Sequence, residues 1–211
     1  MHLPGNSKSD SVKNKPVLFL DRDGVINEDK GFITKKSEII FHPEIFDICR
    51  HFLDLNYKIV VVSNQSGIGR GVINIEDFHK LTIWMIERFS HEGIEIELFL
   101  ASSLDPTRID PPNYESFRRK PNPGLFLDAA EIMDINFNES VMIGDNLSDF
   151  EAAYAAGIGK IFLINSNLAQ NQEYNVYSSH QELMINLAKL NNSKRAHEKK
   201  FIPEESSILR S

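Results

Sequence analysis

Two aspartates separated by one residue follow an apolar run near the N-terminus. Val-Leu-Phe-Leu at 17–20 leads directly into Asp21-Arg22-Asp23-Gly24. The apolar run predicts a buried strand, so both carboxylates stand at its carboxyl end, where ligands bind in open α/β sheets. Close carboxylates repel one another unless a cation compensates, and Mg²⁺ typically takes one or two carboxylates together with water and substrate phosphate. The pair is therefore a candidate magnesium site, although a solvated acidic turn has the same residue types.

Three further polar clusters lie next to predicted elements of secondary structure. They are Ser63-Asn64-Gln65-Ser66-Gly67 after a β-branched run at 57–62, Arg119-Lys120-Pro121 before an amphipathic segment, and Gly144-Asp145-Asn146-x-x-Asp149 after an apolar run at 140–143. The carboxyl ends of parallel strands share one edge of a sheet. We therefore expect the clusters that follow strands to converge.

Together these residue types suit phosphoryl transfer. Asp21, Asp23 and Asp145 offer hard oxygen ligands for one Mg²⁺, the cofactor that we predict. Asp21 can attack phosphorus to form an aspartyl-phosphate, and Asp23 can protonate the leaving oxygen and then activate water. Ser63 and Lys120 complete the candidate catalytic set because a hydroxyl and an ammonium group can stabilise the phosphoryl oxygens.

Apolar runs alternate with amphipathic stretches along the chain, which predicts an α/β fold. We expect a Rossmann-like parallel sheet with helices on both faces. The predicted strands cover 17–20, 57–62, 95–100, 140–143 and 160–164, with helices beginning near Pro43, Asn74 and Gly124 and a last helix at 181–190. Residues 101–118 contain three prolines and no periodicity, which favours a loop. Polar composition predicts disordered tails at 1–15 and 191–211 around one domain at 16–190.

Composition limits the possible partners. The formal charge of −7 gives no reason to expect nucleic-acid binding, and no apolar run reaches the length of a membrane span. The single cysteine, Cys49, is predicted to be a small buried hydrophobe and is compatible with a reducing compartment. Without the apolar centre of a secretory signal, the chain is predicted to be cytoplasmic, and a monomer is favoured.

The four clusters resemble the four motifs of the haloacid dehalogenase-like phosphatases. More narrowly, Asp-Arg-Asp-Gly, Ser-Asn-Gln-Ser-Gly-Ile-Gly-Arg-Gly and Arg-Lys-Pro-x-Pro-Gly are similar to motifs of the D-glycero-D-manno-heptose 1,7-bisphosphate phosphatases and the related histidinol-phosphate phosphatases. The resemblance runs from about Pro16 to Ile164. It implies a Mg²⁺-dependent phosphatase without a large cap domain. The implied reaction is hydrolysis of the 7-phosphate of a phosphorylated heptose in lipopolysaccharide or surface-polysaccharide precursor synthesis.

The resemblance also implies a set of substrate-binding residues. They are Asp29, Lys30, Gly31, Phe32, Asn64, Gln65, Ser66, Arg119 and Asn146. Asn146 replaces the lysine that the heptose enzymes often carry, so it brings no charge. Family members commonly have a zinc-binding loop of three cysteines and a histidine before the Arg-Lys pair. Residues 101–118 contain neither residue type, so no zinc is expected there, and packing of Tyr114 and Phe117 is the predicted replacement.

Three alternative functions remain open at this level. Histidinol-phosphate hydrolysis shares the motifs. A non-catalytic phospholigand-binding protein on the same scaffold is disfavoured because Asp21 and Asp23 are both retained. A phosphatase acting on nucleic-acid ends is disfavoured because the net charge is negative and the sequence has no stripe of basic residues.

Overall fold

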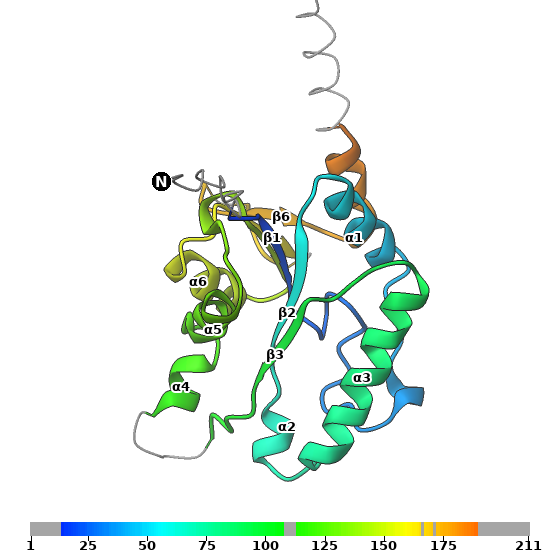
Figure 1. Cartoon of the computed structure of the whole chain (residues 1–211), viewed down its shortest axis with the longest axis vertical. Coiled ribbons are helices and arrows are strands. Elements are labelled where there is room, and N and C mark those ends of the chain that lie inside the picture. Colours follow the sequence, from blue (N-terminus) through cyan, green and yellow to red (C-terminus); the bar gives the residue numbers. More distant parts are fainter. Residues whose placement is uncertain (1–13, 108–112, 166, 171, 190–211) are drawn as a thin grey trace, which may run out of the picture.

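The computed structural model describes residues 14–107, 113–165, 167–170 and 172–189 (Figure 1). Within these ranges the strands form one parallel sheet in the order β3-β2-β1-β4-β5-β6. Their bounds are β1 (Val17–Leu20), β2 (Lys58–Asn64), β3 (Leu98–Ser102), β4 (Val141–Gly144), β5 (Lys160–Ile164) and β6 (Asn175–Tyr177). The predicted Rossmann-like parallel sheet is confirmed.

Helices cover both faces of the sheet, as Figure 1 shows. The helices are α1 (Ile45–Asp54), α2 (Ser66–Gly69), α3 (Ile75–His91), α4 (Tyr114–Arg118), α5 (Gly124–Ile132) and α6 (Leu147–Ala155), and a further helix spans 180–189. Because side chains alternate along a strand, β1 contributes Leu18 and Leu20 to one core cluster and Val17 and Phe19 to the other.

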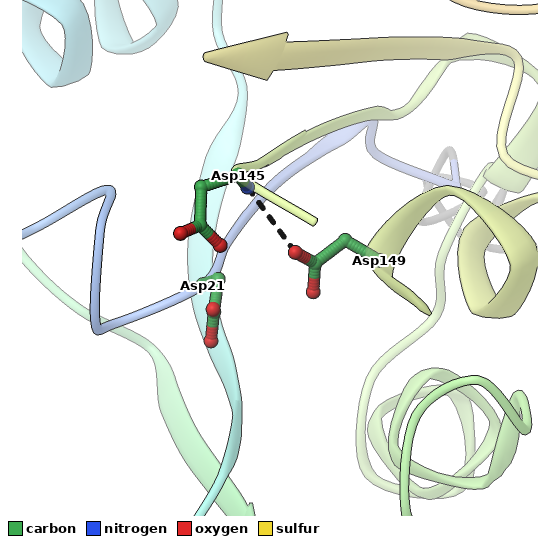
Figure 2. A group of neighbouring side chains, drawn as sticks. All are labelled: Asp21, Asp145 and Asp149. Carbon is green, nitrogen blue, oxygen red and sulfur yellow. Dashed lines mark hydrogen bonds between the residues drawn. The ribbon is translucent and has the colours of Figure 1, made fainter. Parts of the chain in front are cut away.

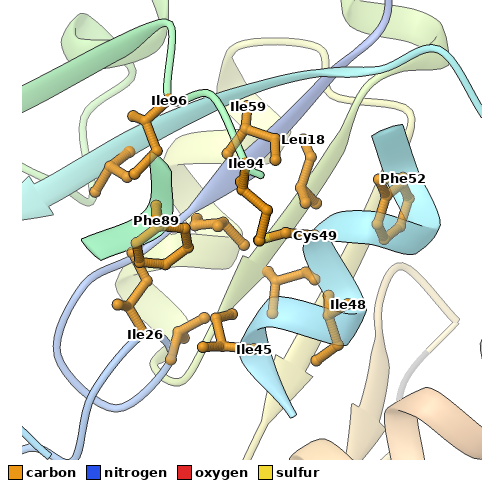
Figure 3. Packing of buried hydrophobic residues seen from close by; sticks show 14 of the residues in the cluster. Leu18, Ile26, Ile45, Ile48, Cys49, Phe52, Ile59, Phe89, Ile94 and Ile96 are labelled. Carbon is orange, nitrogen blue, oxygen red and sulfur yellow. The ribbon is translucent and has the colours of Figure 1, made fainter. Parts of the chain in front are cut away.

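The first cluster packs the sheet against α1, α3 and the helix at 180–189, and the second packs it against α5 and α6. In Figure 3, Leu18 of β1 lies with Ile48 and Cys49 of α1 and Phe89 of α3. Cys49 is fully buried, as predicted. The two apolar layers hold the sheet from both sides and leave its carboxyl edge free to carry polar groups.

The connection from β1 to α1 contains a short 3₁₀ helix, η1 (Lys36–Glu38), and two isolated bridges, a parallel one between Asp23 and Asn27 and an antiparallel one between Asn27 and Phe41. No large cap domain is inserted in this connection, in agreement with the prediction. The rest of this connection consists of turns and loop.

Some local predictions differ from the structure. β3 begins three residues later than predicted, and β6 was not predicted because a three-residue edge strand has little sequence signal. The predicted loop at 101–118 contains α4, which begins after Asn113 because its side chain accepts a hydrogen bond from Ser116 N. Tyr114 and Phe117 are 61% and 43% exposed, so their rings bury little apolar surface, although Tyr114 Oη donates to Asp128 Oδ1 of α5 at 2.5 Å.

Both predicted tails fall largely outside the described residues, as 1–13 and 190–211 are not described. Lys15, placed in the predicted N-terminal tail, donates its N–H to Asp134 O and accepts from Asn136 N. Among the described residues, no helix is both long and apolar enough to cross a membrane.

Candidate active site

The carboxyl ends of β2, β1 and β4 lie side by side because β1 is the central strand of the three. Asp21 follows β1, Ser63 lies near the end of β2, and Asp145 follows β4. These strand ends surround a cavity of about 320 Å³. It is lined by Asp21, Asp23, Asp29, Gly31, Phe32, Ser63, Asn64, Gln65, Ser66, Gly67, Arg119, Lys120, Asp145, Asn146, Ser148 and Asp149.

Nearly every predicted site residue lines this cavity. The exception is Lys30, an exposed residue whose Nζ lies 3.4 Å from Glu28 Oε2. Asp149 and Ser148 line the cavity although neither was predicted as a site residue. Asp149 is the more informative of the two because its side chain is almost completely buried.

Three carboxylates meet in the cavity, as Figure 2 shows. One oxygen from each of Asp21, Asp145 and Asp149 lies within 4.8 Å of the others. Burial, together with the Asp21 and Asp149 carboxylates, raises the pKa of Asp145 to about 8. Burial likewise raises the pKa of Asp21 to about 6, against the opposing charge of Lys120. The raised pKa values show that positive charge nearby does not fully compensate the three carboxylates. Their hard oxygen donors fit Mg²⁺.

Asp23 is held apart from that cluster by hydrogen bonds. Arg22 donates from Nε to Asp23 Oδ1 at 3.0 Å and from Nη2 to Oδ2 at 2.6 Å. Asn27 Nδ2 donates to Oδ1 at 3.0 Å, and Gln65 Nε2 donates to Oδ2 at 2.9 Å. The structure therefore groups Asp149, rather than the predicted Asp23 side chain, with Asp21 and Asp145.

Lys120 is fully buried among oxygen atoms. Its Nζ donates to Val62 O at 2.9 Å and lies 2.9 Å from Asp21 Oδ1 and 2.5 Å from Asp149 Oδ1. Burial by itself lowers the pKa of Lys120, but the Asp149 and Asp21 carboxylates raise it above its usual value. Lys120 therefore carries its charge at neutral pH and contacts the nucleophile predicted from the sequence.

Asn64 binds the backbone of Lys120. Its Nδ2 donates to Lys120 O at 2.9 Å, and its Oδ1 accepts from Lys120 N at 3.1 Å. Gln65 Nε2 donates to Ser63 Oγ at 2.9 Å as well as to Asp23. Two predicted substrate ligands thus also hold the backbone of Lys120 and the side chains of Ser63 and Asp23, which are predicted catalytic residues, in place.

Asn146 and Asp149 share the first turn of α6. Asn146 is its N-cap, with Oδ1 accepting from Ser148 N at 3.2 Å. Asp149 Oδ2 accepts from Asp145 N and Asn146 N at 3.2 and 3.1 Å. Asn146 and Asp149 form a capping box. This pattern can be recognised in the sequence, and it predicts that Asp149 lies beside Asp145.

Comparison with known proteins agrees with this fold and site. The family model described as HAD-hydrolase-like matches residues 117–185, a range that contains Lys120, Asp145 and Asp149. D-glycero-α-D-manno-heptose-1,7-bisphosphate 7-phosphatase of Campylobacter jejuni is 36% identical over 169 residues, covering 80% of this chain and 93% of that protein. D-glycero-β-D-manno-heptose-1,7-bisphosphate 7-phosphatase of Vibrio cholerae is 38% identical over 153 residues, covering 72% and 82%.

A solved structure has the same fold. The D,D-heptose 1,7-bisphosphate phosphatase of B. bronchiseptica, complexed with magnesium and phosphate, aligns with a TM-score of 0.70 at 22% identity, covering 82% of this chain and 98% of that one. The fold and the carboxylate-lysine site define a haloacid dehalogenase-like hydrolase. Within that class, the chain belongs to the D-glycero-D-manno-heptose-1,7-bisphosphate 7-phosphatase family.

Mg²⁺ is expected to stabilise the protein more at high pH than at low pH. The pKa of Asp145 rises from 3.8 to about 8 on folding. Between these values the folded state binds a proton that the unfolded state has released, so metal-free stability falls as pH rises through this window. A cation competes with that proton and relieves the repulsion. At saturating Mg²⁺ we expect the Tm to rise by about 5–10 °C at pH 8.5 and much less at pH 5.

Thermal unfolding with Mg²⁺ or EDTA at the two pH values measures this difference. Asp145→Asn is the matched variant because it removes the titrating carboxyl group at nearly constant volume. An equal Mg²⁺ effect at both pH values, or an unchanged pH dependence in Asp145→Asn, would contradict the assignment of Asp145 to the cation site.

Proposed function

We propose that this protein hydrolyses the 7-phosphate of a D-glycero-D-manno-heptose 1,7-bisphosphate in a Mg²⁺-dependent reaction. The observation that carries the proposal is the contact between the Asp21 carboxylate and Lys120 Nζ, at 2.9 Å, inside a cavity that also holds Asp23. The relatives named for this reaction support the heptose substrate over histidinol phosphate. A cavity of about 320 Å³ matches the size of sites for small molecules, which run from about 300 to 1,000 Å³.

Asp21 is the nucleophile in this proposal. A carboxylate oxygen of Asp21 bonds to phosphorus while the bond from phosphorus to the sugar oxygen breaks, giving an aspartyl-phosphate and a leaving oxygen that must gain a proton. Lys120 and Ser63 stabilise the phosphoryl oxygens as negative charge shifts during transfer. Mg²⁺, when bound by the Asp21 and Asp145 carboxylates, supplies positive charge that brings the phosphate dianion to a negatively charged nucleophile.

Asp23 is the general acid and then the general base. It donates a proton to the leaving sugar oxygen, and in the second step it takes a proton from the water that attacks the aspartyl-phosphate. This water releases inorganic phosphate and regenerates the Asp21 carboxylate. Arg22, Asn27 and Gln65 orient Asp23 for both steps through the hydrogen bonds described above.

The substrate test is phosphate release from the α and β anomers of the heptose bisphosphate, with histidinol phosphate in parallel, each in Mg²⁺ and in EDTA. We expect fast release from a heptose anomer in Mg²⁺ only. Faster release from histidinol phosphate would assign histidinol phosphate as the substrate and leave the proposed mechanism unchanged. No release from any of the three compounds would refute the proposal and favour a phospholigand-binding protein. Cytoplasmic location, the monomeric state and the absence of nucleic-acid partners stay predictions.

Gly24 is predicted to be essential for the position of Asp145. Gly24 has φ of +84°, and a Cβ atom built on it would lie 2.1 Å from Asp145 Oδ2 and 2.5 Å from Asp145 Cγ. Gly24→Ala must therefore displace the Asp145 carboxylate. We expect phosphate release to fall at least about 100-fold, because a shift of about 1 Å in a catalytic group has an effect of that size.

Gly157→Ala provides the matched control for this substitution. Gly157 has φ of +83°, nearly the same backbone conformation, and nothing lies within 4 Å of its Cβ position. Both variants should show a similar backbone contribution to the loss of stability, and only Gly24→Ala should lose activity. Normal phosphate release by Gly24→Ala would show that the position of Asp145 is not critical.

A further inference from the structure

Arg70 lies beside Phe32, a residue that lines the cavity, and connects it to the segment that follows β3. It directly follows α2, and its Nε donates to Asp105 Oδ1 at 3.0 Å. Its guanidinium carbon lies 5.4 Å from the centroid of the Phe32 ring, which lines the cavity. Arg70 therefore links the loop that carries Phe32 to the segment that follows β3.

Asp105 is the centre of this linkage. Its side chain is only 9% exposed, and Oδ1 also accepts from Thr107 N at 2.9 Å and from Thr107 Oγ1 at 2.7 Å. These bonds to Thr107, with the charge of Arg70, hold the pKa of Asp105 below its usual range, so the carboxylate is ionised at neutral pH. A Cβ on Gly69 would lie 2.3 Å from Ser103 O, so this segment packs directly on the backbone of α2.

The same segment holds Arg119. Arg119 is half-buried at the cavity wall, and its Nη1 donates to Leu104 O at 3.2 Å, one residue before Asp105. Burial and then the positive charge of Arg70 lower the pKa of Arg119, whereas Asp105 raises it. Asp105 therefore pairs directly with Arg70 and offsets part of the charge of Arg119, which is bound to the adjacent Leu104 carbonyl.

We propose that Asp105 and Arg70 are positioning residues that hold Arg119 at the cavity mouth, where it binds the end of the substrate that is not hydrolysed. This inference rests on the proposed function. Arg119 donates to Leu104 O and not to Asp21, so we expect its interaction with the substrate to be equally strong in the ground state and the transition state. Loss of such an interaction raises KM and leaves kcat unchanged.

Kinetics of Asp105→Asn and Arg70→Gln test this proposal. With the heptose bisphosphate in Mg²⁺, we expect each substitution to raise KM about tenfold and to leave kcat within about twofold. With p-nitrophenyl phosphate, which lacks a second phosphate, kcat and KM should both stay within about twofold of the wild type. In an Arg119→Ala background, neither substitution should raise KM further, because residues that act through one group are not additive.

Asp47→Asn is the matched control because Asp47 also accepts from an arginine, Arg50 Nη2 at 2.7 Å, on the exposed part of α1. It should leave both substrates unaffected. Arg70 is exposed, so Arg70→Gln keeps the test valid if Asp105→Asn fails to fold.

The proposal is overturned if KM for the bisphosphate stays unchanged, if kcat falls on both substrates, or if the KM increases add to that of Arg119→Ala. Those outcomes concern the variants alone. Inactivity of the wild type on the bisphosphate would instead overturn the proposed function and this inference together.

Discussion

Asp21→Asn is expected to abolish phosphate release, by at least about 10⁴-fold, while the protein remains folded. Asparagine has nearly the same shape but no anionic oxygen to attack phosphorus. Burial is the main reason that the pKa of Asp21 rises to about 6, and the Asp149 carboxylate adds to this rise. Above that pH the folded protein holds the charged carboxylate at a free-energy cost, so removing the charge should leave the Tm equal or raise it at pH 7.5.

Two measurements check this prediction. Phosphate release by the variant tests the chemistry, and mass spectrometry of acid-quenched wild-type enzyme should find a phosphoryl group on the peptide that contains Asp21. Asp47→Asn on the exposed face of α1 controls for the same substitution at a remote site. Activity of Asp21→Asn above about 1% of wild type would assign the nucleophile to another group.

Lys120→Met is expected to lose both activity and stability. Methionine replaces the buried ammonium group with an apolar side chain of similar length, which leaves the Asp21 and Asp149 carboxylates without their common counter-ion. Breaking a buried ion pair by removing one partner destabilises a protein by about 3–5 kcal/mol. We expect kcat to fall at least about 10³-fold because Lys120 stabilises charge that develops during transfer.

The stability loss in Lys120→Met should shrink as pH falls toward about 6, because without the charge of Lys120 the pKa of Asp21 lies above its wild-type value of about 6. Protonation of Asp21, whose pKa is raised to about 6 in the wild type, removes one of the uncompensated charges. Urea unfolding at pH 5 and pH 8 measures this difference.

Adding Asp149→Asn separates the two roles of Lys120. The amide oxygen of the asparagine can still accept from the N–H groups of Asp145 and Asn146. The double variant should therefore regain part of the stability and none of the activity. A full return of activity would show that Lys120 is structural only.

The predicted strands illustrate which features are readable from sequence. β1 and β5 occur where apolar and β-branched residues form short runs, because strands buried on both faces expose no polar alternation. α3 begins after Asn74, whose Oδ1 accepts from Asp77 N at 2.8 Å, and its apolar residues recur at helical spacing. These signals are local, so they do not depend on the rest of the chain.

The signals that failed depend on distant partners. β6 exists because it pairs with β5, and its three residues have no pattern of their own. The segment at 101–118 was predicted as a loop from its prolines, although Asn113 caps a helix within it. Arg70 belongs to one of the quoted motifs, but no local pattern links it to Asp105, which lies 35 residues away.

The residue types alone predict the chemistry that the chain carries. The types and spacing of Asp21, Asp23 and Lys120 specify groups whose reactivity is intrinsic to the side chain, and hydrophobic periodicity specifies which elements carry them. The approach of Asp21 to the Asp145 and Asp149 carboxylates, and the hydrogen bonds from Asn64 to the backbone of Lys120, are visible only in the folded protein. These contacts depend on how neighbouring strands align and on how closely their loops approach, and packing across the whole sheet sets both.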